Sequence, residues 1–341
     1  MKFLIAGLGS IGRRHLRNLV ALGEQDIVLY RSYRSTLPDD DVAVYPVETN
    51  LEAALSYKPD AVIVATPTSL HLEVAIPAVR AGSHLLLEKP ISHSLEGVDE
   101  LRKAARENQS QILVGYQFRF HPSLIQARKW IQEGAIGQPL SFRAVYGEYL
   151  PGMHPWEDYR VSYSARRDLG GGVIFTLCHP LDIVRWMLGE VSELWAFSGC
   201  LNSFGLEVED TAEIGIRFDN GALGSVHLNY NQRPADHHLE VIGNRGTLRW
   251  NNMDGKAAIY RANDVSKGVS DDKWEIYQPP PGFQRNDMFL EELRHFLAVA
   301  RGEVAPQCTL DDGRKALEIA LAAHSSAQNG QLVQMTSFVG E

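Results

Sequence analysis

The sequence has little cysteine, no excess of positive charge and no long apolar run. Its three cysteines, Cys178, Cys200 and Cys308, lie far apart without metal-ligand spacing, so we expect reduced thiols, no disulfide framework and no bound metal. The net charge of −9 disfavours nucleic acid and anionic membranes as partners, because both select basic surfaces. No run of about 18 apolar residues is present, so no transmembrane helix is expected.

The apolar start of the chain lacks the features of a signal peptide. Glycines interrupt it, and Arg13-Arg14-His15 stand where a small-residue cleavage site would lie. We therefore expect a soluble, cytoplasmic protein. With 341 residues, 44% of them apolar and 22% charged, the chain has the length and composition of two ordinary globular domains.

The first third of the sequence alternates short apolar runs with segments of helical spacing. Such alternation is typical of βαβ units in a parallel sheet. The runs lack in-out alternation, which predicts strands buried on both faces. The expected strands are 3–7, 26–30, 60–66, 83–89 and 111–116, and the expected helices are 12–22, 51–57, 71–81 and 95–107.

After about residue 120 the pattern changes to two-residue alternation, which predicts a second sheet, open and mostly antiparallel. Asn220-Gly221 suits a hairpin turn. We divide the chain into a Rossmann domain, 1–118, and a substrate and oligomerisation domain, 119–341, whose last helix can pack back on the first domain. The strand patterns are 141–149, 193–201, 211–218, 223–231 and 237–250; the helical ones are 122–133, 170–188, 286–301 and 311–329; and 251–288 is polar and irregular.

Gly7-Leu8-Gly9-Ser10-Ile11-Gly12 matches the G-x-G-x-x-G pattern of dinucleotide-binding loops. The motif is weak alone, but here it follows an expected strand and opens an expected helix, as dinucleotide binding requires. Gly7 permits the tight turn, Gly9 lets the backbone approach the pyrophosphate, and Gly12 allows close helix–strand packing. The helix N-terminus, with Ser10 and Ile11, then offers N–H groups to the phosphates.

The second strand ends without the acidic residue that binds the ribose hydroxyls of NAD. Arg31, Ser32 and Arg34 stand there instead. Because arginine can bind a 2′-phosphate through two hydrogen bonds, we expect NADP in preference to NAD. The alternative is that these are solvated loop residues of a permissive NAD site.

Three further segments carry a resemblance to a known family. They are Ala65-Thr66-Pro67-Thr68-Ser69-Leu70-His71, Leu87-Glu88-Lys89-Pro90-Ile91-Ser92, and Gly170-Gly171-Gly172 followed by His179-Pro180-Leu181-Asp182. With the glycine motif, they make nearly the whole chain similar to the Gfo/Idh/MocA oxidoreductases. The resemblance implies a Rossmann domain plus an α/β domain with an open antiparallel sheet, and NAD(P)-dependent chemistry on sugars, nucleotide sugars or cyclitols. It also implies cofactor contacts by Thr66, Pro67, Thr68, His71, Glu88, Lys89 and Gln117.

Lys89 is the first catalytic candidate. It follows a parallel strand at its carboxyl end, where doubly wound sheets place ligands. Burial disfavours the charged form of lysine, so we expect a lowered pKa suited to proton transfer. The resemblance adds that Glu88 contacts the cofactor and that a cis peptide at Pro90 aims Lys89. The alternative is a surface lysine that ends a strand.

His179 is the second catalytic candidate. Thr176, His179 and Asp182 interrupt an apolar helical pattern at three-residue spacing, which predicts a polar stripe facing a ligand. The resemblance implies that His179 assists Lys89 or positions the substrate. Many relatives carry Asp where this chain has Thr176, and Pro180 should kink an interior helix. Asp182 either orients His179 or packs with Arg185.

Substrate contacts are expected from two segments. In the resembled family Gln117 and Arg119 lie in a hinge that lines the substrate site, although Arg119 could equally pair with a structural carboxylate. Segment 149–167 mixes aromatic and charged residues, which suits polyol recognition, unless it is a rigid loop around a buried Trp156. The candidates in this segment are Trp156, Tyr159, Arg160, Tyr163 and Arg166. Lys89, Thr176 and His179, outside the segment, complete the expected substrate contacts.

Other functions stay open at this point. The resembled family includes a non-catalytic regulator, and a sugar–sugar oxidoreductase with tightly bound NADP is a third possibility. His237 and His238 are adjacent on a strand and should face opposite sides, which excludes a shared metal. An open sheet with one apolar face predicts a homodimer or homotetramer that buries this face.

Overall fold

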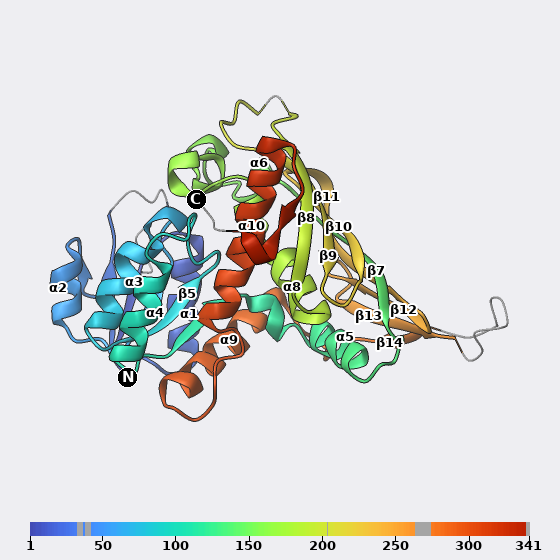
Figure 1. Ribbon diagram of the computed structural model, residues 1–341. Helices are drawn as coiled ribbons and strands as arrows, with labels where there is room; N and C mark the ends of the chain where they lie inside the picture. Colours follow the sequence, from blue (N-terminus) through green and yellow to red (C-terminus); the bar gives the residue numbers. More distant parts are fainter. Residues whose placement is uncertain (33–36, 38–41, 203, 263–273, 339–341) are drawn as a thin grey trace.

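The protein, described by a computed structural model over residues 1–32, 37, 42–202, 204–262 and 274–338, contains two sheets side by side (Figure 1). Arg34 lies outside the described residues. The first sheet has six parallel strands in the order β3-β2-β1-β4-β5-β6, which is the Rossmann order. Its strands are β1 (Phe3–Ala6), β2 (Ile27–Tyr30), β3 (Val47–Glu48), β4 (Ala61–Val64), β5 (His84–Glu88) and β6 (Ile112–Gly115).

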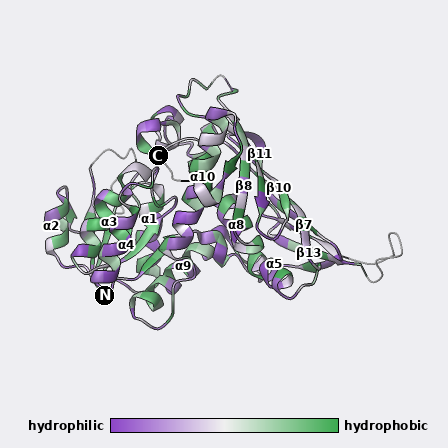
Figure 2. Ribbon diagram, in the orientation of Figure 1, coloured by the Kyte–Doolittle hydropathy of each residue, from purple (hydrophilic) through white to green (hydrophobic). Residues whose placement is uncertain are grey.

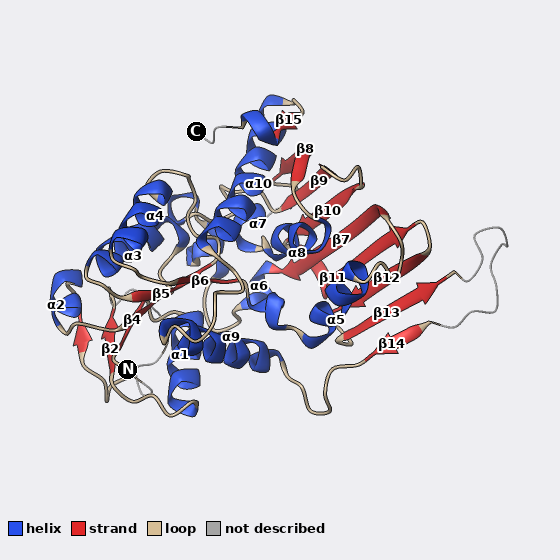
Figure 3. Ribbon diagram, turned by 60° about the horizontal axis from the view of Figure 1, so that its bottom comes forward, coloured by secondary structure: helices blue, strands red, loops and turns tan. Residues whose placement is uncertain are grey.

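Helices cover both faces of this sheet, which explains the continuous apolar runs of its strands. In Figure 3, α3 and α4 lie on one face, and α1 with α9 on the other. Figure 2 shows hydrophobic colour concentrated on the strands between them. The helices of the first domain are α1 (Ser10–Ala21), α2 (Leu51–Ser56), the 3-10 turn η1 (Thr68–Leu70), α3 (His71–Arg80) and α4 (Val98–Glu107).

The second sheet has nine strands in the order β14-β13-β12-β11-β7-β10-β9-β8-β15. Every neighbouring pair is antiparallel except β7 and β10, so the sheet is mixed but mostly antiparallel, as predicted. Gly221, at φ +86°, turns the chain between β9 and β10. The strands are β7 (Pro139–Tyr149), β8 (Val191–Gly199), β9 (Thr211–Phe218), β10 (Leu223–Asn229), β11 (Asn231–Gly243), β12 (Gly246–Asn251), β13 (Lys256–Arg261), β14 (Glu275–Tyr277) and β15 (Val333–Gln334).

The apolar face of the second sheet is covered by helices of the same chain, chiefly α5, α8 and α10 (Figure 3). This apolar face was expected to be buried by a second subunit. That reason for assembly is wrong, because helices of the same chain already cover the face. In the described ranges the opposite face carries no helix, and charged side chains such as Glu213 and Arg217 alternate there with the exposed Phe197 and Leu223. The helical elements are η2 (Gln117–Phe120), α5 (Pro122–Gln132), α6 (Leu150–Met153), η3 (Tyr159–Val161), η4 (Tyr163–Ala165), η5 (Arg167–Leu169), α7 (Val173–Thr176), α8 (His179–Leu188), α9 (Arg285–Ala300), α10 (Leu310–Asn329) and η6 (Met335–Ser337).

Two expectations about secondary structure were wrong. The expected single helix over 170–188 is two helices, α7 and α8, separated at Leu177-Cys178. Pro180 therefore lies in the first turn of α8, where its missing N–H costs nothing, and it kinks no helix. The segment expected to be irregular contains β13 and β14, and in β13 the buried Ala257 and Ile259 alternate with the partly exposed Lys256, Ala258 and Tyr260.

The last two long helices return to the first domain after the second sheet is complete. Helix α9 packs on α1, where the Arg14 guanidinium lies over the Phe289 ring at 4.5 Å from its centre. Val114 N–H donates to Cys308 O at 2.9 Å, and α10 then runs from β6 to β8. The chain thus crosses between the two domains three times.

The three cysteines are all free, as predicted. Among the described residues no helix combines the length and hydropathy needed to span a membrane.

Candidate active site

The glycine loop forms a tight turn between β1 and α1. Gly7 has φ +92°, and a Cβ on Gly12 would lie 1.9 Å from Gly7 O, so the loop and helix can approach this closely only with glycine. Gly9, in contrast, has open space where its Cβ would point. Helix α1 begins with no side-chain cap and no acidic residue in its first turn. The loop therefore fits an anion such as a pyrophosphate, which its free N–H groups would bind.

The end of β2 carries the predicted ribose-binding residues. Arg31 is buried, at 6% exposure, and its N–H donates to Glu48 O, while Ser32 is exposed. No carboxylate follows Tyr30 directly, as the sequence indicated.

The loop after β4 contains Thr66, Pro67, Thr68 and His71. The Thr66 hydroxyl is buried without a hydrogen-bond partner in the described structure, so it is available to a ligand at the sheet edge. In His71, Nδ1 lies 2.9 Å from Pro90 O and Nε2 2.9 Å from Thr66 O, so the ring lies between two loops. Its expected cofactor contact stays a prediction.

Lys89 lies at the carboxyl end of β5 and crosses to the second domain. The Lys89–Pro90 peptide is cis, as expected, and Lys89 Nζ donates to Thr176 O at 2.9 Å. Thr176 is the last residue of α7, so this contact joins the catalytic candidate to the segment before His179. Thr68 of the first domain lies at the same contact between the domains and packs against Gly170 of the second.

The pKa of Lys89 differs from the expectation. Burial lowers it, but the acidic groups of Cys178, Tyr163 and Glu88 raise it by more, so the pKa lies above the ordinary lysine value. The expected lowering is therefore wrong, because burial here comes with neighbours that favour the charged form. Lys89 is protonated at neutral pH.

Glu88 points away from Lys89 Nζ into the protein. Its Oε1 lies 2.8 Å from Nε2 of the buried His15, and its Oε2 accepts from the Lys89 N–H at 3.3 Å. Burial alone would raise the pKa of Glu88, but His15 and Lys89 lower it overall. Both oxygens contact protein groups, and the expected cofactor contact of Glu88 stays a prediction.

His179 begins α8 and is almost fully buried among aromatic rings. The Gln117 amide nitrogen lies 3.2 Å from His179 Nε2, and because an amide nitrogen only donates, the ring proton sits on Nδ1. Nδ1 has no partner among the residues described. Burial, and then the charge of Lys89, hold the pKa of His179 well below its usual value. His179 is thus a neutral donor with one N–H to spare.

Arg119 and Asp182 form a closed ion pair beside this site. Arg119 Nε and its terminal NH2 donate to the two oxygens of Asp182 at 2.9 and 2.6 Å, and a third nitrogen donates to Gln307 O at 2.7 Å. Both side chains are at most 2% exposed. The predicted substrate contact of Arg119 is therefore corrected to the structural alternative. Asp182 neither orients His179 nor bonds to Arg185, whose partners are Glu190 and Asp312.

The candidate substrate loop is held mainly by its own polar residues. Trp156 is 53% exposed, so the loop is not built around a buried tryptophan. Arg160 pairs with Asp158 and Arg166 with Asp168 at the surface. Tyr159 donates to Phe204 O at 3.3 Å, and Tyr163 is near enough to Lys89 to affect its pKa. Among these candidates, Tyr163 is thereby brought near Lys89.

Sequence reasoning missed two residues of this region. His154, at the end of α6, places Nε2 3.4 Å from Ser10 Oγ of the glycine loop and pairs with Glu157. Arg285, at the start of α9, carries a charge that lowers the pKa of both His154 and His179. Neither belongs to a motif, and only the fold brings them to the site. His237 is buried against Tyr146, with ring centres 3.5 Å apart, while the half-exposed His238 pairs with Asp236, so these two histidines face opposite sides as predicted.

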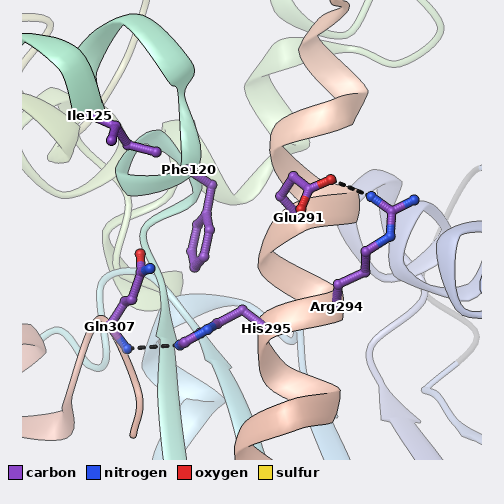
Figure 4. A pocket seen from close by; sticks show the side chains of 6 residues that line it. All are labelled: Phe120, Ile125, Glu291, Arg294, His295 and Gln307. Atoms are coloured by element: carbon purple, nitrogen blue, oxygen red, sulfur yellow. Dashed lines mark hydrogen bonds and ion pairs between the residues drawn. The ribbon is translucent and has the colours of Figure 1, made fainter. Parts of the chain in front are cut away.

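A shallow surface groove lies apart from these residues (Figure 4). Its side chains come from η2, α5, α9 and the segment before α10, and Figure 4 shows Glu291 paired with Arg294 along α9. None of the catalytic candidates lines it. The groove is lined by Phe120, Ile125, Glu291, Arg294, His295 and Gln307.

Comparison with known proteins agrees with this geometry. Residues 1–116 match the oxidoreductase family with an NAD-binding Rossmann fold, and residues 124–249 match the GFO/IDH/MocA C-terminal domain. The chain is 30% identical to scyllo-inositol 2-dehydrogenase (NAD(+)) of Bacillus subtilis, over 97% of this chain and 95% of that protein. It is 27% identical to myo-inositol 2-dehydrogenase of Thermotoga maritima over the full length of both.

Solved structures share the fold. Levoglucosan dehydrogenase in complex with NADH and levoglucosan superposes with a TM-score of 0.86 at 22% identity, over 98% of this chain and 99% of that one. The WlbA dehydrogenase from Bordetella pertussis, in complex with NADH and UDP-GlcNAcA, gives a TM-score of 0.79 at 22% identity over 98% of both chains. The chain described here belongs to the Gfo/Idh/MocA family of NAD-binding oxidoreductases.

Proposed function

We propose that this enzyme transfers hydride between a nicotinamide cofactor and a CH–OH or carbonyl carbon of a sugar or cyclitol. Lys89 is the proton-transfer residue and His179 a hydrogen-bond donor to the same oxygen. The observation that carries the proposal is the contact of Lys89 Nζ with the α7–α8 segment, where the Nδ1 of His179 has no hydrogen-bond partner among the residues described. A nicotinamide dinucleotide on the glycine loop would accept or supply the hydride.

The direction of proton transfer follows from the charge on Lys89. In the reduction of a carbonyl, Lys89 acts as it stands: Nζ donates a proton as negative charge develops on the oxygen. In the oxidation of a hydroxyl, Lys89 must first lose that proton. An oxidised nicotinamide ring is positive, and a positive charge near Lys89 lowers its pKa and favours this loss.

His179 positions the reacting oxygen. Gln117 occupies Nε2 and so fixes the tautomer in which Nδ1 carries the proton. Because the pKa of His179 lies well below its usual value, the ring stays neutral and accepts no proton during the reaction. Its Nδ1–H stabilises the oxygen in both directions.

A polyol substrate is supported by the relatives, whose names include two inositol dehydrogenases, and by the polar loop beside the site. The exposed Trp156 offers a flat face. Tyr159, Arg160 and Arg166 of the same loop would exchange their bonds to Phe204 O, Asp158 and Asp168 for substrate hydroxyls. We also propose that Thr176 and Tyr163, which lie near Lys89, contact the substrate.

Lys89→Ala tests the function. On a panel of sugars and cyclitols, the variant should lose about 10²- to 10⁴-fold in kcat while it binds cofactor like the native enzyme. Lys129→Ala, which removes an exposed lysine of α5, is the matched control and should keep full activity. A Lys89→Ala enzyme with native turnover would place proton transfer elsewhere.

We also propose NADP in preference to NAD. The support is the exposed Ser32, the Arg31 beside it and the lack of a carboxylate after Tyr30. Charge-assisted bonds to the 2′-phosphate should make NADP(H) bind about 10-fold or more tighter than NAD(H). Isothermal titration of both cofactors measures this, and Ser32→Asp should reverse the order. Equal affinities for the native enzyme would contradict the proposal.

Finally, we propose that the helix-free face of the second sheet forms a homo-oligomer contact, as a homodimer or homotetramer. Phe197, Leu223 and Ile242 are 63%, 49% and 41% exposed on the second sheet, which supports a contact there. Light scattering at micromolar concentration should show at least a dimer, and Phe197→Asp should weaken it. A stable native monomer would refute this contact.

A further inference from the structure

Three titratable side chains meet in the interior between α1, β5 and α9. They are His15, Glu88 and Glu292, with exposures of 0%, 6% and 0%. One nitrogen or oxygen of each lies within 4.8 Å of those of the other two. His15 and Glu88 are directly hydrogen-bonded at 2.8 Å. Glu292 comes from the helix that returns to the first domain and completes the cluster.

Two groups of the cluster lack a hydrogen-bond partner within the described part of the chain: both carboxylate oxygens of Glu292, and Nδ1 of His15. Of the three side chains, Glu292 is the one with no hydrogen bond at all. An ionised carboxylate in such a place costs several kcal/mol unless a cation or several donors face it. The charge that acts most strongly on Glu292 is that of Glu88, which has the same sign.

The other charged or titratable groups around the cluster do not replace that partner. From α1, Arg14 stacks on Phe289 and His15 bonds to Glu88. From the end of β5, Lys89 directs its Nζ to Thr176 O. Cys308, after α9, is a buried neutral thiol whose pKa is raised well above its usual value by burial, then Asp182. His71, from the start of α3, has its ring nitrogens against Pro90 O and Thr66 O. Since no described side chain donates to Glu292, a proton on Glu292 avoids two adjacent buried charges.

We propose that Glu292 is the neutral acid in the native enzyme, which leaves Glu88 as the negative charge beside Lys89. Two carboxylates this close cannot both ionise at low cost. Burial and then the charge of Glu88 raise the pKa of Glu292 well above its usual value, which agrees with the geometry. With Glu292 neutral, the charges of Glu88 and Lys89 balance.

The consequence for catalysis rests on the proposed role of Lys89. Glu88 is one of the groups that keep Lys89 protonated. A second negative charge at Glu292 would raise the pKa of Lys89 further and so shift the pH profile of kcat upward. Glu292→Gln keeps the site neutral and of the same shape, so it should retain the native kcat and pH profile, which Glu88→Gln should shift downward.

Infrared spectroscopy of the native enzyme tests the proton directly and needs no activity. At neutral pH the native-minus-Glu292→Gln difference spectrum should contain the carbonyl band of a protonated carboxylic acid, shifted in D2O. Glu209, whose pKa burial raises to about 7, contributes to both spectra and cancels in the difference. Glu291→Gln, which removes the neighbouring acid that pairs with Arg294 (Figure 4), is the matched control and should give no such difference band. Equal bands in the native and Glu292→Gln enzymes would overturn the proposal, as would a stoichiometric metal ion in the native protein that is lost in this variant.

Stability against pH gives a second readout. A carboxyl whose folded pKa lies above its unfolded value stabilises the fold below the unfolded pKa, and this contribution is lost as pH rises. The Tm of the native enzyme should therefore fall relative to that of Glu292→Gln between pH 4.5 and 7, while Glu291→Gln follows the native curve. Parallel curves for the native and Glu292→Gln enzymes would contradict the proposal. If Lys89→Ala were fully active, the proposed function would fail and these two readouts would still decide the state of Glu292.

Discussion

Two polar contacts join the same pair of elements, η2 and α8, and they differ in how much bonding capacity they use. Gln117 meets His179, and two residues later Arg119 meets Asp182. The second contact is charged, bidentate and closed. The first is neutral and leaves one ring nitrogen without a partner in the part of the chain that the structure describes. The difference separates structure from chemistry: a group can act on a ligand only with bonding capacity that the protein has not already used.

The largest expected effect is on the closed contact. Asp182→Asn removes the charge that compensates a guanidinium only 2% exposed, and it should lower the free energy of unfolding by about 3–5 kcal/mol. Urea denaturation measures this. Asp168→Asn, in an exposed pair, should change stability little. Arg119→Met combined with Asp182→Leu should recover most of the loss. If Asp182→Asn were as stable as native but inactive, the contact would be catalytic.

The Gln117–His179 contact should respond in the opposite way, with a loss of activity and not of stability. His179→Leu removes the Nδ1–H that we assign to the substrate oxygen, and kcat should fall about 10- to 100-fold with only a modest change of KM. His179→Asn can present an amide N–H near the position of Nδ1 and should recover part of the rate. Steady-state kinetics with both variants measure this. An equal loss in the two would argue against a hydrogen-bond role.

The next effect is on folding stability at acid pH, which should also distinguish the two contacts. His179 has a pKa in the folded state well below its usual 6.5, so the unfolded chain binds the extra proton first. Stability is therefore lost as pH falls below about 6.5, by up to about 1.4 kcal/mol per pH unit. Unfolding curves from pH 7 to 5 should be flatter for His179→Leu than for the native enzyme. Identical slopes would mean that His179 is charged in the fold.

The smallest effect is expected at Gln117. Gln117→Leu leaves His179 Nε2 without its donor, and the loss of one neutral hydrogen bond should cost about 1 kcal/mol of transition-state stabilisation. Gln117→Glu should move the ring proton to Nε2 and raise the pKa of His179. Nitrogen NMR of the labelled imidazole reports both changes. An unchanged tautomer in Gln117→Glu would show that Gln117 does not set it.

The sequence predicted the elements whose signal is local. The five apolar runs of the first domain are strands, and the glycine motif forms the turn that Gly7 and Gly12 require. β3, with two residues, is too short to give a pattern. The break between α7 and α8 was missed because the apolar spacing continues through Leu177-Cys178 while the backbone does not.

The site was predicted where one motif contains the chemistry, as at Lys89, and missed where the partner is distant. Asp182 pairs with Arg119, 63 residues earlier, which spacing along a helix cannot reveal. His154 reaches the glycine loop only through the packing of the two domains. Glu292 did leave a signal, since it falls on the buried stripe of α9 with Met288, Phe289 and Phe296.

The return of α9 to the first domain has a consequence for how the protein is made. A ribosome delivers residues 1–116 long before α9, yet α1 is covered by α9, and the β6 N–H of Val114 bonds to Cys308 O. The cofactor domain therefore cannot finish folding until nearly the whole chain has emerged. A nascent chain arrested near residue 250 should leave the α1 surface uncovered and open to chaperones, although its dinucleotide-binding turn is already complete.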